Sequence, residues 1–453
     1  MKTLFVELFS VAAAPHLLSE GGLVSKLKDK NVRIILLIPS LEEYKKMAAP
    51  HLQENVIFEE IKKTFPSTYF QKVFVFFYSY LIFTGTTKML ATFGARADSP
   101  PAGGNRHLAW LKSLLANTFG RSKWIKVKAV PWLYQRIFNE RPYRELFEKH
   151  SPDAIFVSNI AFNPALELIS EAKRMGVKSM GMAANWDHLN KYYIPMHADH
   201  LLVQNEPMSR EAVEYHTYDP KQVSIVGFPQ FDKFADLDLV KPKEEYFKEF
   251  GIPLDHKILL HFSGSVYALD EADILEEVAK WINDGVFGPA TLMVRPYAGL
   301  RERKQEEEKY KRLLNMKNVV FNWRQDNDSS NNKANYVSMF AYADIIISVF
   351  STTAIEASIF DKPTVTIGFD GYENRPFHKS IKRLETLSHF KHVLDTGSVY
   401  VARNFENLQR KISEYISDPV KDREQRKNLI SKMCFKIDGK SNERIADFII
   451  SKI

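Results

Sequence analysis

The chain of 453 residues contains very little cysteine, with Cys434 as its one representative. A single cysteine cannot form an internal disulfide, and it cannot supply the several thiolates of a cysteine-based zinc site. This scarcity predicts a protein of a reducing, cytosolic compartment. Glycine (19) and proline (21) are also few, which excludes a collagen-like or low-complexity chain.

The sequence also lacks an apolar run long enough to cross a bilayer. The most apolar internal stretch, residues 73–87, has fifteen uncharged residues, whereas a spanning helix needs about 20. Residues 1–14 carry the lysine, apolar run and alanines of a signal peptide, but Glu7 interrupts a run that is already short. We therefore favour a first strand over residues 3–8, and a signal peptide is the alternative.

What is present is ordinary globular material with an uneven charge. Apolar residues make up 45% and charged residues 26%, and the length suggests two domains. Residues 61–144 contain fourteen lysines and arginines but only the acids Asp98 and Glu140, a balance of +12, which leaves −5 for the rest of the chain. Aromatic residues are interleaved with these cations. Such a segment predicts contact with an anionic partner or surface.

Outside a helical, basic segment at about residues 60–148, strand and helix patterns alternate along the chain. Continuous apolar strands separated by helices are typical of a parallel sheet covered on both faces. The first alternation predicts strands at 3–8, 32–39, 153–158, 177–183, 198–204 and 223–227, and helices at 15–28, 163–175 and 206–216.

After a polar stretch at 228–257, read as a linker, a second alternation begins. It predicts strands at 258–262, 291–294, 319–321, 344–349 and 364–367, and helices at 271–283, 302–315 and 353–360, with helices to the end. We therefore expect two doubly wound α/β domains, residues 1–228 and 229–453, with a cleft between them. Ligands of such sheets bind at the carboxyl ends of the strands.

The strand at 344–349 leads into a hydroxyl-rich turn and then a helix. Ser351 is expected to cap that helix, whose free N–H groups, with the hydroxyls of Ser351, Thr352 and Thr353, suit a phosphate. Glu356, on the first turn, is placed to accept hydrogen bonds from ribose hydroxyls. The alternative is a plain capped helix in which Glu356 only complements the helix dipole.

Two further loops of the second domain suit phosphate binding. Ser263, Gly264 and Ser265 follow its first strand, where small residues let the backbone approach a diphosphate. Arg295 follows the next strand and can clamp a phosphate with two hydrogen bonds. A Ser-Gly-Ser turn or an arginine alone is a weak signal, but three such loops on neighbouring strands together predict a nucleotide site.

In the first domain, Asp187 and His188 follow the predicted strand at 177–183. A carboxylate beside an imidazole offers a general base. The alternative is a turn in which Trp186 packs and Asp187 caps the next segment. Residues 227–232 are interpreted as a turn with a structural role.

Several tempting motifs are rejected. The pairs Asp236/Asp238 and Asp326/Asp328 lie in polar stretches typical of solvated loops, and no histidines show metal-ligand spacing. The sequence has no complete dinucleotide fingerprint, no phosphate-binding loop of the GxxxxGK[ST] type and no HExxH. We expect neither a metal nor a cofactor.

Taken together, residues 150–370 resemble the GT-B superfamily of nucleotide-sugar glycosyltransferases, whose members have two Rossmann-like domains. The sequence is most similar to the branch of the teichoic-acid CDP-glycerol glycerophosphotransferases and the UDP-N-acetylglucosamine 2-epimerase relatives. The shared motifs are the cleft loop Trp186-Asp187-His188, the Gly-x-Pro-x-x-Asp of Gly227–Asp232, the Arg295-Pro-Tyr297 loop, and the strand–turn–helix element around Val349-Phe350-Ser351-Thr352.

Two positions depart from the family pattern. Asp187 stands where the family has a catalytic His, and Tyr297 replaces a second His. The resemblance therefore implies an inverting, metal-independent glycosyltransferase with Asp187 as base, using a nucleotide-sugar donor and an envelope or lipid-linked glycan acceptor. A teichoic-type polyol-phosphate transferase and a sugar-nucleotide epimerase or hydrolase are the alternatives.

The basic segment 61–144 is expected to lie on an anionic membrane surface. Amphipathic helices at an interface need both cations and aromatic residues, and this segment has both. The competing interpretation packs its aromatic face on the first domain. A nucleic-acid partner is not expected, because no recognition module accompanies the charge. We therefore predict a cytoplasmic protein attached peripherally to a membrane.

Overall fold

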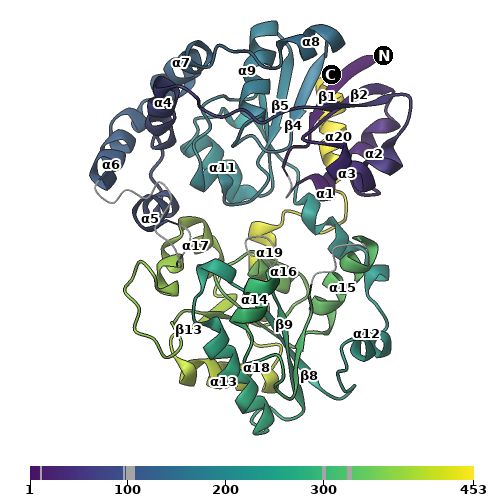
Figure 1. The fold of residues 1–453 in the computed structure, drawn as a ribbon, viewed down its shortest axis with the longest axis vertical. Helices are drawn as coiled ribbons and strands as arrows, with labels where there is room; N and C mark the ends of the chain where they lie inside the picture. Colours follow the sequence, from purple (N-terminus) through teal and green to yellow (C-terminus); the bar gives the residue numbers. More distant parts are fainter. Residues whose placement is uncertain (11–12, 95–96, 98–107, 298–302, 324–328) are drawn as a thin grey trace. The chain divides into compact units, whose positions relative to one another are not determined.

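The computed structural model describes residues 1–10, 13–94, 97, 108–297, 303–323 and 329–453. The chain divides into two compact units, each an α/β body (Figure 1). The first comprises residues 1–87, 107–232 and 434–453, and the second comprises residues 88–106 and 233–433.

The first unit is built on a seven-stranded parallel sheet of order β3-β2-β1-β4-β5-β6-β7. Its strands are β1 (Lys2–Glu7), β2 (Val32–Ile38), β3 (Val56–Glu60), β4 (Ala154–Val157), β5 (Lys178–Met182), β6 (His200–Val203) and β7 (Val223–Ile225). The order reverses between β1 and β4, which makes their carboxyl ends the switch point of the sheet, where ligands of such folds bind.

The second unit repeats this design with six parallel strands in the order β10-β9-β8-β11-β12-β13. The strands are β8 (Lys257–Phe262), β9 (Ala290–Arg295), β10 (Val319–Phe321), β11 (Ile345–Ser348), β12 (Thr364–Ile367) and β13 (Val399–Ala402). Its switch point lies between β8 and β11. The predicted α/β class with two Rossmann-like bodies is confirmed.

Helices connect the strands in both units. Those of the first unit are α1 (Ala14–Leu17), α2 (Leu23–Lys28), α3 (Leu41–Ala48), α4 (Tyr69–Ser79), α6 (Ala109–Asn117), α7 (Val130–Ile137), α8 (Arg144–His150), α9 (Ala165–Met175), α10 (His188–Lys191), α11 (Glu206–Glu214) and α20 (Ser441–Lys452). The second unit has α12 (Lys243–Glu249), α13 (Glu271–Asn283), α14 (Arg303–Lys309), α15 (Ser329–Tyr342), α16 (Thr353–Ile359), α17 (Ser388–Leu394), α18 (Phe405–Ser417) and α19 (Arg423–Met433), and α5 (Gly85–Phe93) begins in the first unit and ends in the second.

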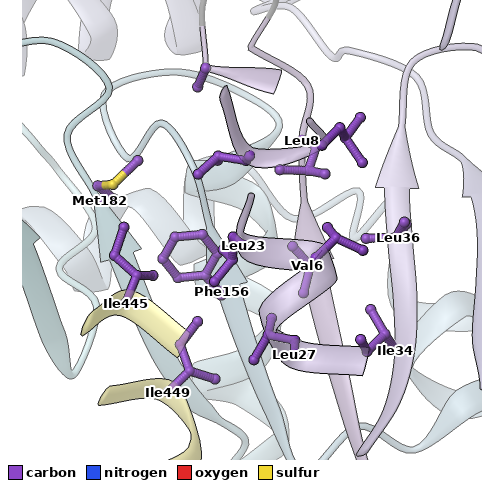
Figure 2. Close-up of a cluster of buried hydrophobic side chains, with 14 of the residues drawn as sticks. Val6, Leu8, Leu23, Leu27, Ile34, Leu36, Phe156, Met182, Ile445 and Ile449 are labelled. Carbon is purple, nitrogen blue, oxygen red and sulfur yellow. The ribbon is translucent and has the colours of Figure 1, made fainter. Parts of the chain in front are cut away.

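The C-terminal helix α20 belongs to the core of the first unit, although the sequence predicted residues 229–453 as one domain. Figure 2 shows Ile445 and Ile449 of α20 beside Val6, Phe156 and side chains of α2. These apolar side chains are fully buried, and together they cover one face of the sheet. The chain therefore leaves the first unit after residue 232 and returns to it at residue 434.

The turn at residues 227–232 holds the returning helix. Asp232 accepts hydrogen bonds from the backbone N–H groups of Ser441 and Asn442, both at 3.1 Å, and so caps the start of α20 from a distant part of the chain. Gly227 has φ +86°, and a Cβ there would lie 2.8 Å from Oγ of Ser441. The structural role expected for this turn agrees with these contacts.

Other elements differ from the sequence expectations. The helix predicted over 15–28 is split into α1 and α2 by a sharp turn at which Gly21 has φ +76°. The turn also requires glycine at position 22, because a Cβ there would lie 2.6 Å from the carbonyl oxygen of Leu17. Strands β3 and β13 and helices α3, α10, α12 and α15 were not predicted. The segment 60–148 is not all part of the first body, because residues 88–106 group with the second, where Phe93 packs against Phe377. The predicted Pro/Gly loop at 99–105 lies outside the described residues.

Glu7 ends β1 with a buried carboxyl group at the switch point. It accepts hydrogen bonds from the Phe9 N–H (2.7 Å) and from the N–H (3.0 Å) and hydroxyl (3.2 Å) of Ser158, the residue that follows β4. Burial raises the pKa of Glu7 to about 7, although these hydrogen bonds oppose the rise. The Glu7 side chain therefore links the loops after β1 and β4. Its ionisation is unfavourable because the resulting charge is buried away from water.

The raised pKa of Glu7 predicts a pH-dependent loss of stability. Between its ordinary pKa of 4.5 and about 7, the folded state binds the proton more tightly than the unfolded state, so stability falls as pH rises through this window. The free energy of unfolding falls by about 3 kcal/mol in total, and the fall is complete one to two pH units above the pKa of the folded state. We expect Glu7→Gln, which cannot ionise, to remove this slope in urea unfolding measured from pH 4 to pH 8.

The matched control is Glu54→Gln, at an exposed position of the same unit, which should keep the wild-type slope. Equal pH slopes for all three proteins would contradict a buried, titrating Glu7.

Candidate functional site

The site predicted in the second unit centres on the turn between β11 and α16. The N-cap of α16 is Thr352, whose side chain makes no capping hydrogen bond, so the expected cap at Ser351 is displaced by one residue. Ser351 instead accepts a hydrogen bond from the Thr353 N–H through its hydroxyl oxygen, at 3.3 Å. Ser351 and Thr352 are partly exposed, and Thr353 is buried. Their role as phosphate donors stays a prediction.

Glu356 is a buried carboxylate on the first turn of α16. Its Oε2 accepts a hydrogen bond from the Tyr336 hydroxyl at 2.9 Å, and no other hydrogen bond to its carboxylate occurs among the described residues. Burial raises its pKa, while the Lys233 ammonium and the Tyr336 hydroxyl oppose the rise. A buried carboxylate with so few donors has acceptor capacity left for a ligand.

Arg295 ends β9 and lies near the same group of residues. Its Nη1 donates to the carbonyl oxygen and the Oδ1 of Asn322, both at 2.8 Å, which fixes the guanidinium beside β10. Its charge acts on Lys233 and Tyr336, and it lowers the pKa of Lys233 further. Tyr297, which follows in the chain, is 47% exposed. The second unit therefore gathers Lys233, Arg295, Tyr336 and Glu356 in one charged cluster.

The Ser263–Ser265 loop after β8 has its polar groups engaged in a different, acidic network. The Ser263 hydroxyl donates to Glu271 at 2.8 Å, and the Gly264 N–H donates to the same carboxylate at 2.7 Å. The Ser265 hydroxyl donates to Glu306 at 3.2 Å, and its N–H donates to Ser263. These donors bond to carboxylates rather than lining an open phosphate site. The diphosphate-binding role of this loop therefore stays a prediction, and the charged cluster around Glu356 does not depend on it.

A lysine neutralises part of that acidic network. The Lys309 ammonium donates to the Glu271 carboxylate and to the carbonyl oxygens of Ser265 (2.8 Å) and Ala268 (3.0 Å). Lys309 and His261 hold the pKa of Glu271 far below its usual value against strong desolvation. The network joins β8, α13 and α14 into one unit.

Asp187 and His188 lie in the loop after β5, as the sequence predicted, but their environments differ. Asp187 is partly exposed and pairs with Lys191 at 3.5 Å. His188 is buried against Phe162 and Tyr192, and burial lowers its pKa to about 4. A histidine with this pKa is neutral at pH 7, and its burial leaves Asp187 as the more accessible of the two. Asp187 is the N-cap residue of α10 without a side-chain capping bond.

Sequence reasoning missed Lys233, Tyr336 and Glu7. Lys233 lies in a stretch read as a linker, and Tyr336 lies on α15, which showed no clear period. Glu7 was noted only as a charge in an apolar run. A signal was available for Glu7 alone, because an ionisable residue at the end of a buried first strand is unusual.

The rejected metal motifs have ordinary roles where the structure describes them. Asp236 caps a short 3-10 helix by accepting from the Asp238 N–H at 3.2 Å. Asp326 and Asp328 lie outside the described residues. Within the described part of the chain, no three His, Cys, Asp or Glu side chains are grouped as a metal ion would require. The expectation of no cofactor stays a prediction.

The basic segment carries both inward and outward aromatic residues. Phe74, Tyr78 and Tyr134 are buried, as the packing interpretation expected. Large apolar side chains on neighbouring elements are nevertheless exposed, and we call these the aromatic surface: Phe65, Tyr69, Phe70, Val73, Trp110, Leu114, Phe119, Trp124 and Trp132. Among the described helices, none is long and apolar enough to span a bilayer.

Comparison by sequence finds no relatives, since no protein-family model and no curated protein matches the chain. Comparison by structure does. MnaA of S. aureus, solved with UDP, aligns with a TM-score of 0.56 at 12% identity over 99% of this chain and 96% of that one. A putative UDP-N-acetylglucosamine 2-epimerase from Listeria monocytogenes gives 0.56 at 11% identity over 100% and 97%.

A glycosyltransferase from Rickettsia africae gives a TM-score of 0.52 at 11% identity over 100% of this chain and 99% of that one. At such low identity these alignments show the fold alone. The two-domain fold that the resemblance implied is confirmed, while the likeness to the CDP-glycerol transferases stays a prediction. The chain has the two-domain GT-B fold of glycosyltransferases and UDP-N-acetylglucosamine 2-epimerases.

Proposed function

We propose that the protein is a metal-independent, inverting glycosyltransferase that transfers a sugar from a nucleotide-diphosphate donor to an envelope or membrane-associated glycan. The observation that carries the proposal is Glu356, a buried carboxylate on the helix that follows β11, with a single hydrogen bond to it among the described residues and with the Lys233 ammonium acting on it. A carboxylate accepts from both ribose hydroxyls, and neighbouring cations suit the diphosphate. Relatives of the same fold were solved with UDP and with UDP-N-acetylglucosamine.

In the proposed reaction an acceptor hydroxyl attacks the anomeric carbon of the donor sugar. The bond from that carbon to the diphosphate oxygen breaks, and its electron pair leaves with the diphosphate. The proton of the acceptor passes to the Asp187 carboxylate. Asp187 is favoured as base because it is partly exposed, whereas His188 is buried.

The second candidate is a sugar-nucleotide epimerase or hydrolase, favoured by the UDP-N-acetylglucosamine 2-epimerases among the structures of the same fold. Such an enzyme would convert the sugar nucleotide without an acceptor. Incubation with UDP-N-acetylglucosamine alone, followed by analysis of the sugar, separates the two. A teichoic-type transferase would instead need a CDP-linked polyol phosphate.

We expect Glu356→Gln to weaken nucleotide binding. The variant keeps the shape of the side chain but loses the charge that strengthens hydrogen bonds to ribose hydroxyls, so the expected loss is about 1–3 kcal/mol. Isothermal titration with UDP, CDP, GDP and ADP measures it. Glu244→Gln, at an exposed position of the same unit, is the control and should bind like wild type. Unchanged affinity in a folded Glu356→Gln protein would remove Glu356 from the site.

We expect Asp187→Asn to lose most turnover while keeping donor affinity, because a base acts in the transition state and not in donor binding. The measurement is the rate of donor consumption with an acceptor extract, together with nucleotide titration of the same protein. A variant that retains more than about a tenth of the rate, a loss under ~1.4 kcal/mol, would exclude Asp187 as base and leave His188 to be tested.

The membrane part of the proposal rests on the aromatic surface and its charge. Between Glu60 and Glu140 the described residues contain no Asp or Glu, while Lys72, Lys123 and Lys128 are exposed beside the aromatic surface. Lys126 is different. It is buried, and its ammonium donates to the carbonyl oxygen of Tyr215 at 2.7 Å, so it has a structural partner and cannot serve a membrane. We propose a peripheral attachment to an anionic leaflet on the cytoplasmic side.

We expect wild-type protein to sediment with phosphatidylglycerol-containing vesicles and to be released by salt. Replacing Lys123 and Lys128 by Glu should weaken binding by at least ~2 kcal/mol, since each cation near an anionic leaflet contributes on the order of 1 kcal/mol. Replacing Trp110 and Trp124 by Ser should weaken binding without removing the salt dependence. The control exchanges two exposed lysines of the second unit, Lys379 and Lys382, for Glu. Wild-type protein that stays in the supernatant at low salt would refute the attachment.

A further inference from the structure

We propose that Lys233 is a phosphate-binding residue of the nucleotide site, holding the diphosphate of the donor from the segment that begins the second unit. The inference rests on the proposed function and adds to it a residue that the motifs did not indicate. It is carried by the position of the Lys233 ammonium, between two aromatic rings and beside Glu356, where the described residues offer it no hydrogen-bond acceptor.

The ammonium of Lys233 lies over the ring of Tyr336 at 4.0 Å and over the ring of Phe234 at 4.9 Å from the centroids. These two rings are nearly parallel, with centroids 6.2 Å apart. The Tyr336 hydroxyl donates to Glu356, so the lysine and the proposed ribose carboxylate share one aromatic neighbour. Aromatic faces attract a cation without using its N–H donors in hydrogen bonds.

Four other buried or partly buried lysines have an oxygen acceptor. Lys126 donates to the carbonyl of Tyr215, and Lys362 donates to the carbonyl of Ala341 at 2.9 Å. Lys309 donates to two carbonyls and a carboxylate, and Lys411 pairs with Glu414 and Asp422. Lys233 makes no such bond within the described residues, although it is partly buried. An ammonium has three donors, and leaving all three unused near a buried site is costly unless a ligand takes them.

The charges around Lys233 favour an anion with more than one negative charge. Glu356 attracts the ammonium, whereas Arg295 and Lys333 act on it with the same sign of charge. Burial lowers the pKa of Lys233 to about 8, so the side chain is still mainly protonated at pH 7. Lys233 and Arg295 against one carboxylate leave a positive balance that a diphosphate neutralises, while the ribose of the same nucleotide occupies Glu356.

The experiment titrates wild type, Lys233→Met, Lys233→Arg and Lys333→Met with UDP, and in parallel with inorganic pyrophosphate, by calorimetry. We expect Lys233→Met to bind both probes at least tenfold more weakly than wild type. Lys233→Arg should retain at least a third of the wild-type affinity, because it keeps the charge. Lys333→Met, which removes a neighbouring cation, controls for long-range charge and should change affinity by less than threefold.

A structural lysine would give a different result. If Lys233 only fills space between Phe234 and Tyr336, Lys233→Met lowers the unfolding midpoint and leaves the affinity for UDP and pyrophosphate within twofold of wild type, which overturns the inference. An equal loss in Lys333→Met overturns it as well, since the effect is then one of net charge.

Failure of the proposed function is distinguishable from failure of this inference. If wild type binds neither UDP nor the other common nucleoside diphosphates, the proposed function is wrong. The titration with pyrophosphate alone then tests whether Lys233 binds an anion. Pyrophosphate binding that is lost in Lys233→Met supports the anion site, and absence of pyrophosphate binding in wild type overturns it.

Discussion

The return of the chain to the first unit depends on the hydrogen bonds that the backbone N–H groups at the start of α20 donate to the Asp232 carboxylate. The chain leaves the first unit directly after Asp232 and comes back just before α20, so this carboxylate joins the exit and the return of the chain. The helix it caps buries Ile445 and Ile449 in the first core. The next residue along the chain is Lys233. The lysine that we propose to hold the diphosphate therefore follows immediately after the residue that anchors the crossing.

Both sheets place polar groups at the point where strand order reverses, but they use them differently. At the first switch point the Glu7 carboxyl is consumed by internal hydrogen bonds from the loops after β1 and β4. At the second, the loop after β8 is consumed by Glu271 and Glu306, while the turn after β11 leads to Glu356 with one hydrogen bond to its carboxylate. On the proposed function, the acidic network would repel an anionic donor, whereas the cluster of Lys233 and Arg295 would attract it. Electrostatics therefore favours the turn after β11 over the loop after β8, although both contain the small and hydroxyl-bearing residues that suit a phosphate.

The aromatic residues of the basic segment serve two purposes at once. Phe74, Tyr78 and Tyr134 are buried and pack the helices of this segment into the first unit. Trp110, Trp124 and Trp132 are exposed. Lysines divide in the same way, with Lys126 bound to a carbonyl and Lys123 exposed. The packing interpretation therefore holds for the inward-facing residues, and the proposed membrane attachment rests on the exposed ones.

The amino-acid sequence predicts the α/β class and most strands, because buried parallel strands are continuous apolar runs that can be recognised without knowing their partners. It also located Glu356, Arg295 and the Asp187 loop, since residues that follow a strand are placed by the strand. The tertiary structure shows which donors are already used: the loop of residues 263–265 meets Glu271, 8 residues beyond Ser263, and Glu306, 41 residues beyond Ser265. It also decided that α20 belongs to the first core and that Lys233 enters the site of Glu356, because both depend on contacts between residues far apart in sequence, which no local pattern records.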